Sequence, residues 1–106
     1  MNRIAYLENL LVEMPEDPFV PYALALEFVK INDSYKATFY FEKVLKIDAS
    51  YLGLYYQYAK FKLEQRQKKE ALDIVNAGII VAITQANNHT LSELQFLKED
   101  IDDAYF

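Results

Sequence analysis

Residues 17–50 read DPFVPYALALEFVKINDSYKATFYFEKVLKIDAS, and they give the clearest indication of how the chain folds. Asp17 can cap the free N–H groups at a helix start, and Pro18 suits the first helical position. Two runs of apolar residues at helical spacing follow, and residues 32–34 (Asn-Asp-Ser) separate them. Asparagine tolerates the left-handed conformation that closes a helix, and the Asp or Ser after it can cap the next one. The stretch therefore predicts two helices joined by a short turn.

Further helices are expected on both sides of this pair. The chain has only two glycines, and no proline follows Pro21, whereas a sheet protein needs frequent turn residues. Pro15 ends the first helix because it cannot continue the hydrogen-bond ladder. Near the other end, Thr90 and Glu93 fit a capping box that starts the last helix. The six expected helices span residues 2–14, 18–31, 34–48, 51–65, 68–86 and 91–103.

The helices return with a period of about 34 residues, the spacing of repeats built from a helix, a turn and a helix. A shift of this size aligns Leu7 with Phe41 and Val75, and Ala37 with Ala71. Small residues thus recur where helices approach closely, and large apolar residues recur where gaps must be filled. These positions are the predicted core.

One repeat unit in particular resembles a unit of the tetratricopeptide repeat (TPR) family. It pairs Leu24, Ala25 and Phe28 in its first helix with Ala37 and Phe41 in its second, and residues 45–51 resemble the closing pattern of the family. The second unit departs further: it has Lys62 in place of an aromatic residue and Arg66 in place of a turn glycine. The resemblance implies an all-α fold of antiparallel helical hairpins, stacked as a short right-handed solenoid. Its expected parts are a preceding half-unit helix (1–15), a first unit (17–49), a second unit (50–86) and a C-terminal capping helix (90–106).

Composition and charge exclude several classes of protein. The chain has no cysteine, which excludes disulfides and thiol chemistry. Its net charge of −5 argues against a nucleic-acid partner, whose phosphates require a basic surface. The longest weakly charged stretch, residues 74–88, is shorter than the roughly 20 apolar residues that span a bilayer. We therefore expect a cytoplasmic protein with neither a nucleic-acid nor a membrane partner.

No residue pattern predicts an enzyme, a metal site or a cofactor site. His89 is the only histidine, and it lies in an expected turn without a positioned partner. An acidic cluster near the end of the chain lacks the glycines that turn a loop back onto a hard metal ion. The cluster consists of Glu99, Asp100, Asp102 and Asp103. We therefore expect neither catalytic nor metal-binding residues.

The resemblance predicts a binding surface on the concave side of the stacked hairpins. TPR-like proteins commonly bind peptides or partner helices there, and tyrosine suits such a surface because its ring buries area at low entropic cost. TPR domains that clamp acidic chaperone tails carry Lys, Asn and Arg along this groove, whereas here Tyr22, Leu26 and Gln57 occupy the matching places. An apolar or mixed ligand is therefore expected. The predicted groove residues are Phe19, Tyr22, Leu26, Val29, Tyr56, Gln57, Lys60 and Leu63.

Two alternative functions stay open at this point. Short repeat arrays have unprotected ends, so the chain could instead be a structural protein that forms a homodimer through exposed apolar surface. Alternatively, Arg66, Lys68 and Lys69 could contact nucleic acid. A molecular mass that rises with protein concentration would support the homodimer. Salt-sensitive retention on nucleic acid would support a nucleic-acid contact.

Overall fold

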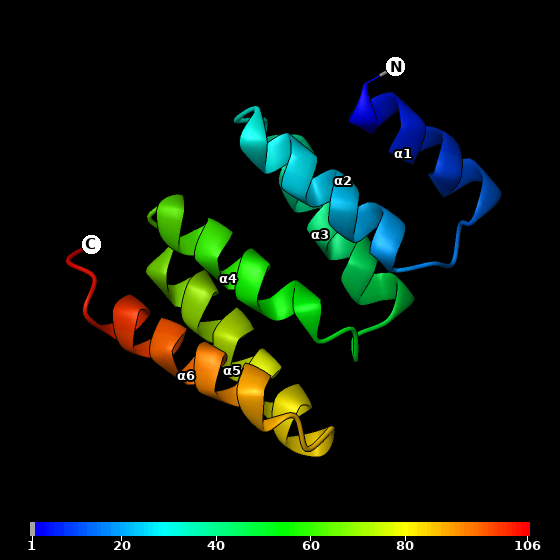
Figure 1. The fold of residues 1–106 in the computed structure, drawn as a ribbon. Helices are drawn as coiled ribbons and strands as arrows, with labels where there is room; N and C mark the ends of the chain where they lie inside the picture. The colour runs from blue at the N-terminus through cyan, green and yellow to red at the C-terminus, as the bar shows by residue number, and fades with distance from the viewer. Residues whose placement is uncertain (1) are drawn as a thin grey trace. The chain divides into compact units, whose positions relative to one another are not determined.

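The computed structural model describes residues 2–106, which form six α-helices and no strand (Figure 1). The structure confirms the all-α fold that the helical spacing predicts, and every helix lies within a few residues of its expected position. The helices are α1 (Arg3–Glu13), α2 (Phe19–Lys30), α3 (Ser34–Ile47), α4 (Gly53–Glu64), α5 (Lys68–Thr84) and α6 (Asn88–Asp102).

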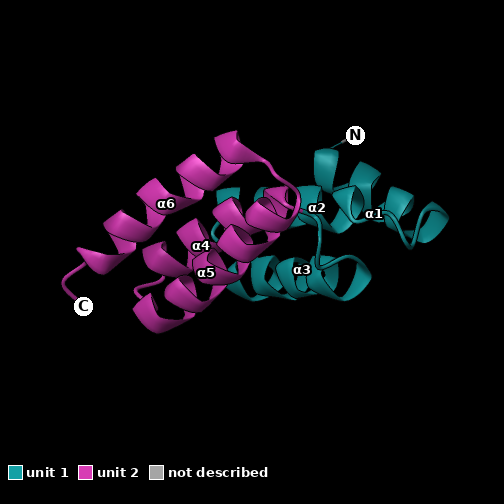
Figure 2. Cartoon of the chain, turned by 90° about the horizontal axis from the view of Figure 1, so that it is seen from below, with its two compact units in different colours: residues 1–51 teal, residues 52–106 magenta. Residues whose placement is uncertain are grey.

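The chain divides into two compact units of three helices each (Figure 2). Unit 1 covers residues 1–51, and within it α2 packs extensively against α3 and also contacts α1. Unit 2 covers residues 52–106, and within it α5 packs against both α4 and α6, while α4 and α6 share a smaller contact. Each unit is therefore one helical hairpin with a third helix packed beside it.

Each helix of unit 1 buries one stripe of apolar side chains, as the repeat spacing predicts. Removing such side chains from water is the main favourable term in folding, at about 25 cal/mol per Å² of apolar surface. Phe41 is the largest of the fully buried side chains. The stripes include Leu7 on α1, Leu24, Ala25 and Phe28 on α2, and Ala37, Phe41 and Val44 on α3. Val20, Pro21 and Ala23 widen the buried face of α2.

In unit 2, the three helices come close together at Gly78. A Cβ atom at this position would lie 2.5 Å from Tyr55 Cβ on α4 and 3.2 Å from Leu94 Cδ1 on α6. Both distances are tighter than ordinary van der Waals contact, so only glycine lets the helices approach this closely. The 34-residue shift also aligns Gly78 with Val44, which is a large apolar residue, so these two aligned positions differ in their packing needs.

Three helices end in the same way, with one residue in the left-handed conformation. These residues are Asn32 (φ 60°), Arg66 (φ 62°) and Ala86 (φ 54°). In each turn, the N–H of the following residue donates to the carbonyl five positions earlier, as from Asn87 to Ala82 at 2.9 Å. This arrangement satisfies carbonyl groups that the end of a helix leaves free. Asparagine tolerates the conformation, whereas arginine and alanine adopt it at a cost.

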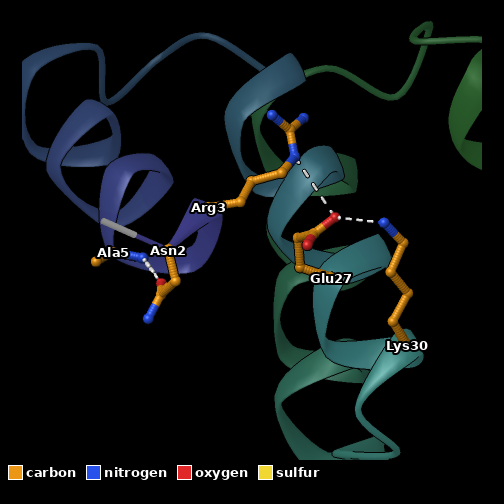
Figure 3. Close-up of polar contacts among 5 residues, drawn as sticks. All are labelled: Asn2, Arg3, Ala5, Glu27 and Lys30. Carbon is orange, nitrogen blue, oxygen red and sulfur yellow. Dashed lines mark hydrogen bonds and ion pairs between the residues drawn. The ribbon is translucent and has the colours of Figure 1, made fainter.

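Side chains cap the starts of α1 and α3. Asn2 Oδ1 accepts a hydrogen bond from the Ala5 N–H at 2.8 Å (Figure 3), and Asp33 does the same for the N–H three residues later. In Figure 3, Glu27 on α2 lies between Arg3 on α1 and Lys30, at 3.5 and 3.1 Å respectively. The Glu27 side chain is largely covered, but Arg3 and Lys30 are more than half exposed, so each pair contributes on the order of 1 kcal/mol and packing remains the main force that holds α1 in place.

The predicted capping box at Thr90 is wrong. The helix α6 begins at Asn88, and Asn87 caps it by accepting a hydrogen bond from the Thr90 N–H at 3.0 Å. The chain already reverses at Ala86, so Asn87 takes the capping position, for which asparagine is preferred over threonine. His89 consequently lies in the first turn of α6 rather than in a loop, and it is exposed.

Candidate interaction surfaces

Within unit 1, the predicted binding stripe on α2 stays accessible to solvent. Phe19 is 47% exposed, and the other members of the stripe are partly exposed, whereas the opposite side of α2 is buried. The separation follows from helical spacing, because positions three, seven and ten residues after Phe19 return to the same face. The stripe consists of Phe19, Tyr22, Leu26 and Val29, and we call it the α2 stripe.

Tyr22 has a structural contact as well as a place on this stripe. Its ring lies against that of Tyr51, with centroids 5.4 Å apart and planes tilted by 56°. Burial raises the pKa of Tyr22, and the nearby Tyr51 raises it further. Burial also raises the pKa of Tyr51, with Asp17 adding to the effect. The pair therefore fixes the position of an aromatic surface whose hydroxyl groups remain neutral well above physiological pH.

Within unit 2, the matching positions on α4 are also accessible. Tyr56, Gln57 and Leu63 are partly exposed, and Lys60 is exposed. The buried residues of α4 lie on its other sides and include Leu54, Tyr55, Tyr58, Ala59 and Phe61. We call Tyr56, Gln57, Lys60 and Leu63 the α4 stripe, and it remains accessible with α6 packed in place.

Helix α3 presents a further exposed surface that the sequence analysis did not identify. Opposite its buried stripe, Tyr35 is 83% exposed and Phe39 is 54% exposed. Both lie beside a shallow hollow of about 370 Å³ that is also lined by Thr38, Glu42, Lys43 and Lys46. The same helical spacing that identified Phe41 as core could have placed Phe39 on the opposite face, about 200° away.

The basic run at residues 66–69 contacts other residues of unit 2. Lys68 Nζ donates hydrogen bonds to the backbone carbonyls of Asp102 and Ala104, at 2.9 and 3.0 Å. The Arg66 guanidinium lies 4.5 Å from the centroid of the Phe106 ring. These contacts attach the segment after α6 to the turn between α4 and α5. Lys69 pairs with an exposed aspartate on its own helix.

The described residues contain no group of three or more side chains that could hold a metal ion. His89 Nε2 lies 3.7 Å from Glu93 Oε1 on the surface of α6, an arrangement that leaves both side chains open to solvent. Across residues 2–106, no helix is both long enough and apolar enough to cross a membrane.

No family model matches the chain, and no curated protein matches it. Solved structures do match it. The chain is 35% identical to a tetratricopeptide repeat domain protein from Salinibacter ruber, solved in solution, with a TM-score of 0.80 over 86% of this chain and 92% of the other. A crystal structure of a tetratricopeptide repeat domain protein from the same organism gives 34% identity and a TM-score of 0.75, over 82% and 98% of the two chains. A protein from Bordetella parapertussis shares the fold at 16% identity, with a TM-score of 0.81 over 96% and 89% of the two chains.

The six helices and these similarities define a class of protein, an all-α helical repeat module of the protein-interaction type. The chain belongs to the tetratricopeptide repeat family. Repeat domains of this family are generally non-enzymatic scaffolds.

Proposed function

We propose that this chain binds a peptide or a helix of a partner protein through the α2 and α4 stripes, the residues of the groove predicted from the sequence. The observation that carries the proposal is the accessibility of the α2 stripe. Three of its four side chains are large and apolar, the fourth is a tyrosine, and none is fully buried. Apolar and aromatic surface that remains accessible beside a folded core is typical of sites that bind other proteins.

The two stripes favour a ligand of mixed character. The α2 stripe carries no charge, and the α4 stripe carries a single positive charge on Lys60 together with the amide of Gln57. An amphipathic segment offers both kinds of side chain, because apolar residues suit the α2 stripe and an acidic residue suits Lys60. Fully acidic tails fit poorly because the stripes offer only one cation for them.

The test is a selection from a random peptide library on the immobilised domain, followed by fluorescence anisotropy with the enriched peptides. The stripe variant is Leu26→Lys/Leu63→Lys, which places one charge in each stripe at a partly exposed position. The matched control is Ile80→Lys/Ile83→Lys, which makes the same kind of change at residues that are 65% and 60% exposed. All variants are checked for folding by circular dichroism.

We expect the enriched peptides to bind the wild type and the control equally, and to lose at least about tenfold in affinity for the stripe variant, because a lysine in an apolar contact must be desolvated. Equal binding to the stripe variant would place the peptide site elsewhere on the molecule. Weaker binding to the control than to the stripe variant would contradict the proposal as well.

A further inference from the structure

The outward face of α3 combines exposed aromatic rings with positive charge. Tyr35 and Phe39 project from the side opposite the buried stripe, and Lys43 and Lys46 continue the same face toward the end of the helix. The helix carries three lysines and one glutamate within a chain of net charge −5. Within residues 2–106, neither Lys43 nor Lys46 forms an ion pair.

The outward face of α6 has the complementary composition. Phe96 is 70% exposed and lies beside a second shallow hollow that Ser92, Gln95 and Glu99 also line. Asp103 follows Glu99 by four residues and therefore lies on the same side, opposite the buried residues of α6. Residues 91–106 contain five acidic residues and one basic residue.

The two faces also match in spacing. On α3, an aromatic residue at position 39 is followed by a lysine four residues later and another seven residues later. On α6, an aromatic residue at position 96 is followed by acidic residues three, four and seven residues later. Two such helices side by side in parallel can bring Phe39 against Phe96 and Lys46 toward Asp103, because both helices rise by about 1.5 Å per residue.

We propose that α3 of one copy of this chain binds α6 of a second copy through these two faces. The ring contact supplies apolar burial, and the lysines pair with carboxylates that are otherwise solvated. Because the two faces are different, each copy carries one basic face on α3 and one acidic face on α6. The contact is therefore heterologous and joins copies head to tail.

Glu42 is the one acidic residue on the α3 face, and it opposes the acidic face of the second copy. It is exposed and forms no ion pair among the described residues. Its replacement by lysine should therefore strengthen the contact, since a like charge at an interface is unfavourable. A substitution that increases association is a sharper test than a loss, because general damage to the fold does not produce it.

The experiment is analytical ultracentrifugation of the full chain over a range of protein concentrations, at low and at high salt. The reversal variants are Lys43→Glu/Lys46→Glu on α3 and Glu99→Lys/Asp103→Lys on α6. A control matched to the α3 reversal, Lys30→Glu/Lys69→Glu, makes the net charge more negative by the same amount on other helices. A further sample mixes the two reversal variants in equal amounts. In this mixture the unchanged α3 face of one variant can bind the unchanged α6 face of the other, and the two reversed faces also carry opposite charges.

We expect the wild type and the control to associate as the concentration rises, and salt to weaken this association. Each reversal variant alone should associate at least about tenfold more weakly, the mixture should regain association, and Glu42→Lys should associate more tightly than the wild type. A monomeric wild type at every concentration would overturn the proposal. Association that both reversal variants retain, a mixture that stays monomeric, or a Glu42→Lys variant that associates no more tightly than the wild type would overturn it too.

Discussion

The left-handed residue that ends α5 is an alanine, and this predicts that Ala86→Gly stabilises the protein. Alanine in this conformation costs about 1–2 kcal/mol relative to a residue without a Cβ atom. Glycine also increases the conformational entropy of the unfolded chain, which lowers the free energy of unfolding by about 0.4–1 kcal/mol. We therefore expect a net gain of about 0.5–1 kcal/mol in the free energy of unfolding, or a few degrees in the melting temperature.

Arg66 provides the matched comparison, because it has nearly the same backbone conformation and a side chain that does make a contact. Arg66→Gly gains the same backbone term but loses the contact of the guanidinium with the Phe106 ring, which contributes about 0.5–1 kcal/mol at an exposed site. The two effects nearly cancel. The free energy of unfolding should therefore change little in Arg66→Gly and rise in Ala86→Gly.

The assay is urea unfolding of both variants and the wild type, followed by far-ultraviolet circular dichroism. A loss of stability in Ala86→Gly would refute the reasoning about backbone strain. A gain in Arg66→Gly as large as that in Ala86→Gly would show that the contact with Phe106 contributes nothing. The variant Phe106→Leu, combined with Arg66→Gly, measures the coupling between the two positions directly.

Three further predictions concern packing, capping and titration. Gly78→Ala should destabilise unit 2 by about 1–3 kcal/mol in thermal unfolding, because the added methyl group has no room. An increase in stability would mean that α4 and α6 move apart easily. Asn87→Ala should lower the free energy of unfolding by about 1 kcal/mol in urea unfolding, and Thr90→Ala should lower it clearly less, since the Asn87 side chain caps α6. A larger loss in Thr90→Ala would instead support the capping box predicted at Thr90. Burial keeps the pKa of Tyr22 and Tyr51 above about 10 in the folded state, so the unfolded chain loses these protons first. Stability should therefore fall as the pH rises above about 10, less steeply in Tyr22→Phe, and unfolding curves that do not change with pH in that range would contradict this.

The helices and their buried stripes could be predicted because both depend on local spacing. Leu24 and Phe28 lie four residues apart on one face, and Asp33 begins the next helix with a side chain that can reach a free N–H group. Such relations extend over a few residues and leave a pattern in the sequence. The 34-residue period, together with the residues of the first unit, then indicated the resemblance to the family.

Features that depend on competition between neighbouring residues were harder to predict. The reversal after α5 occurs at Ala86 and leaves Asn87 to cap α6, although asparagine tolerates the left-handed conformation better than alanine does. The outward face of α3 was missed for another reason. The prediction of binding residues covered only the groove, whereas Phe39 is exposed on the side of α3 opposite its buried stripe. The groove residues themselves stay a prediction.

The close approach at Gly78 also has a consequence for how this sequence can diverge. Any larger residue there requires room that only changes at Tyr55 or Leu94 can provide. The three positions lie on three different helices and are widely separated in the chain, but they share one small volume. Among relatives of this protein, these positions should therefore covary: a side chain at 78 should accompany a smaller residue at 55 or 94.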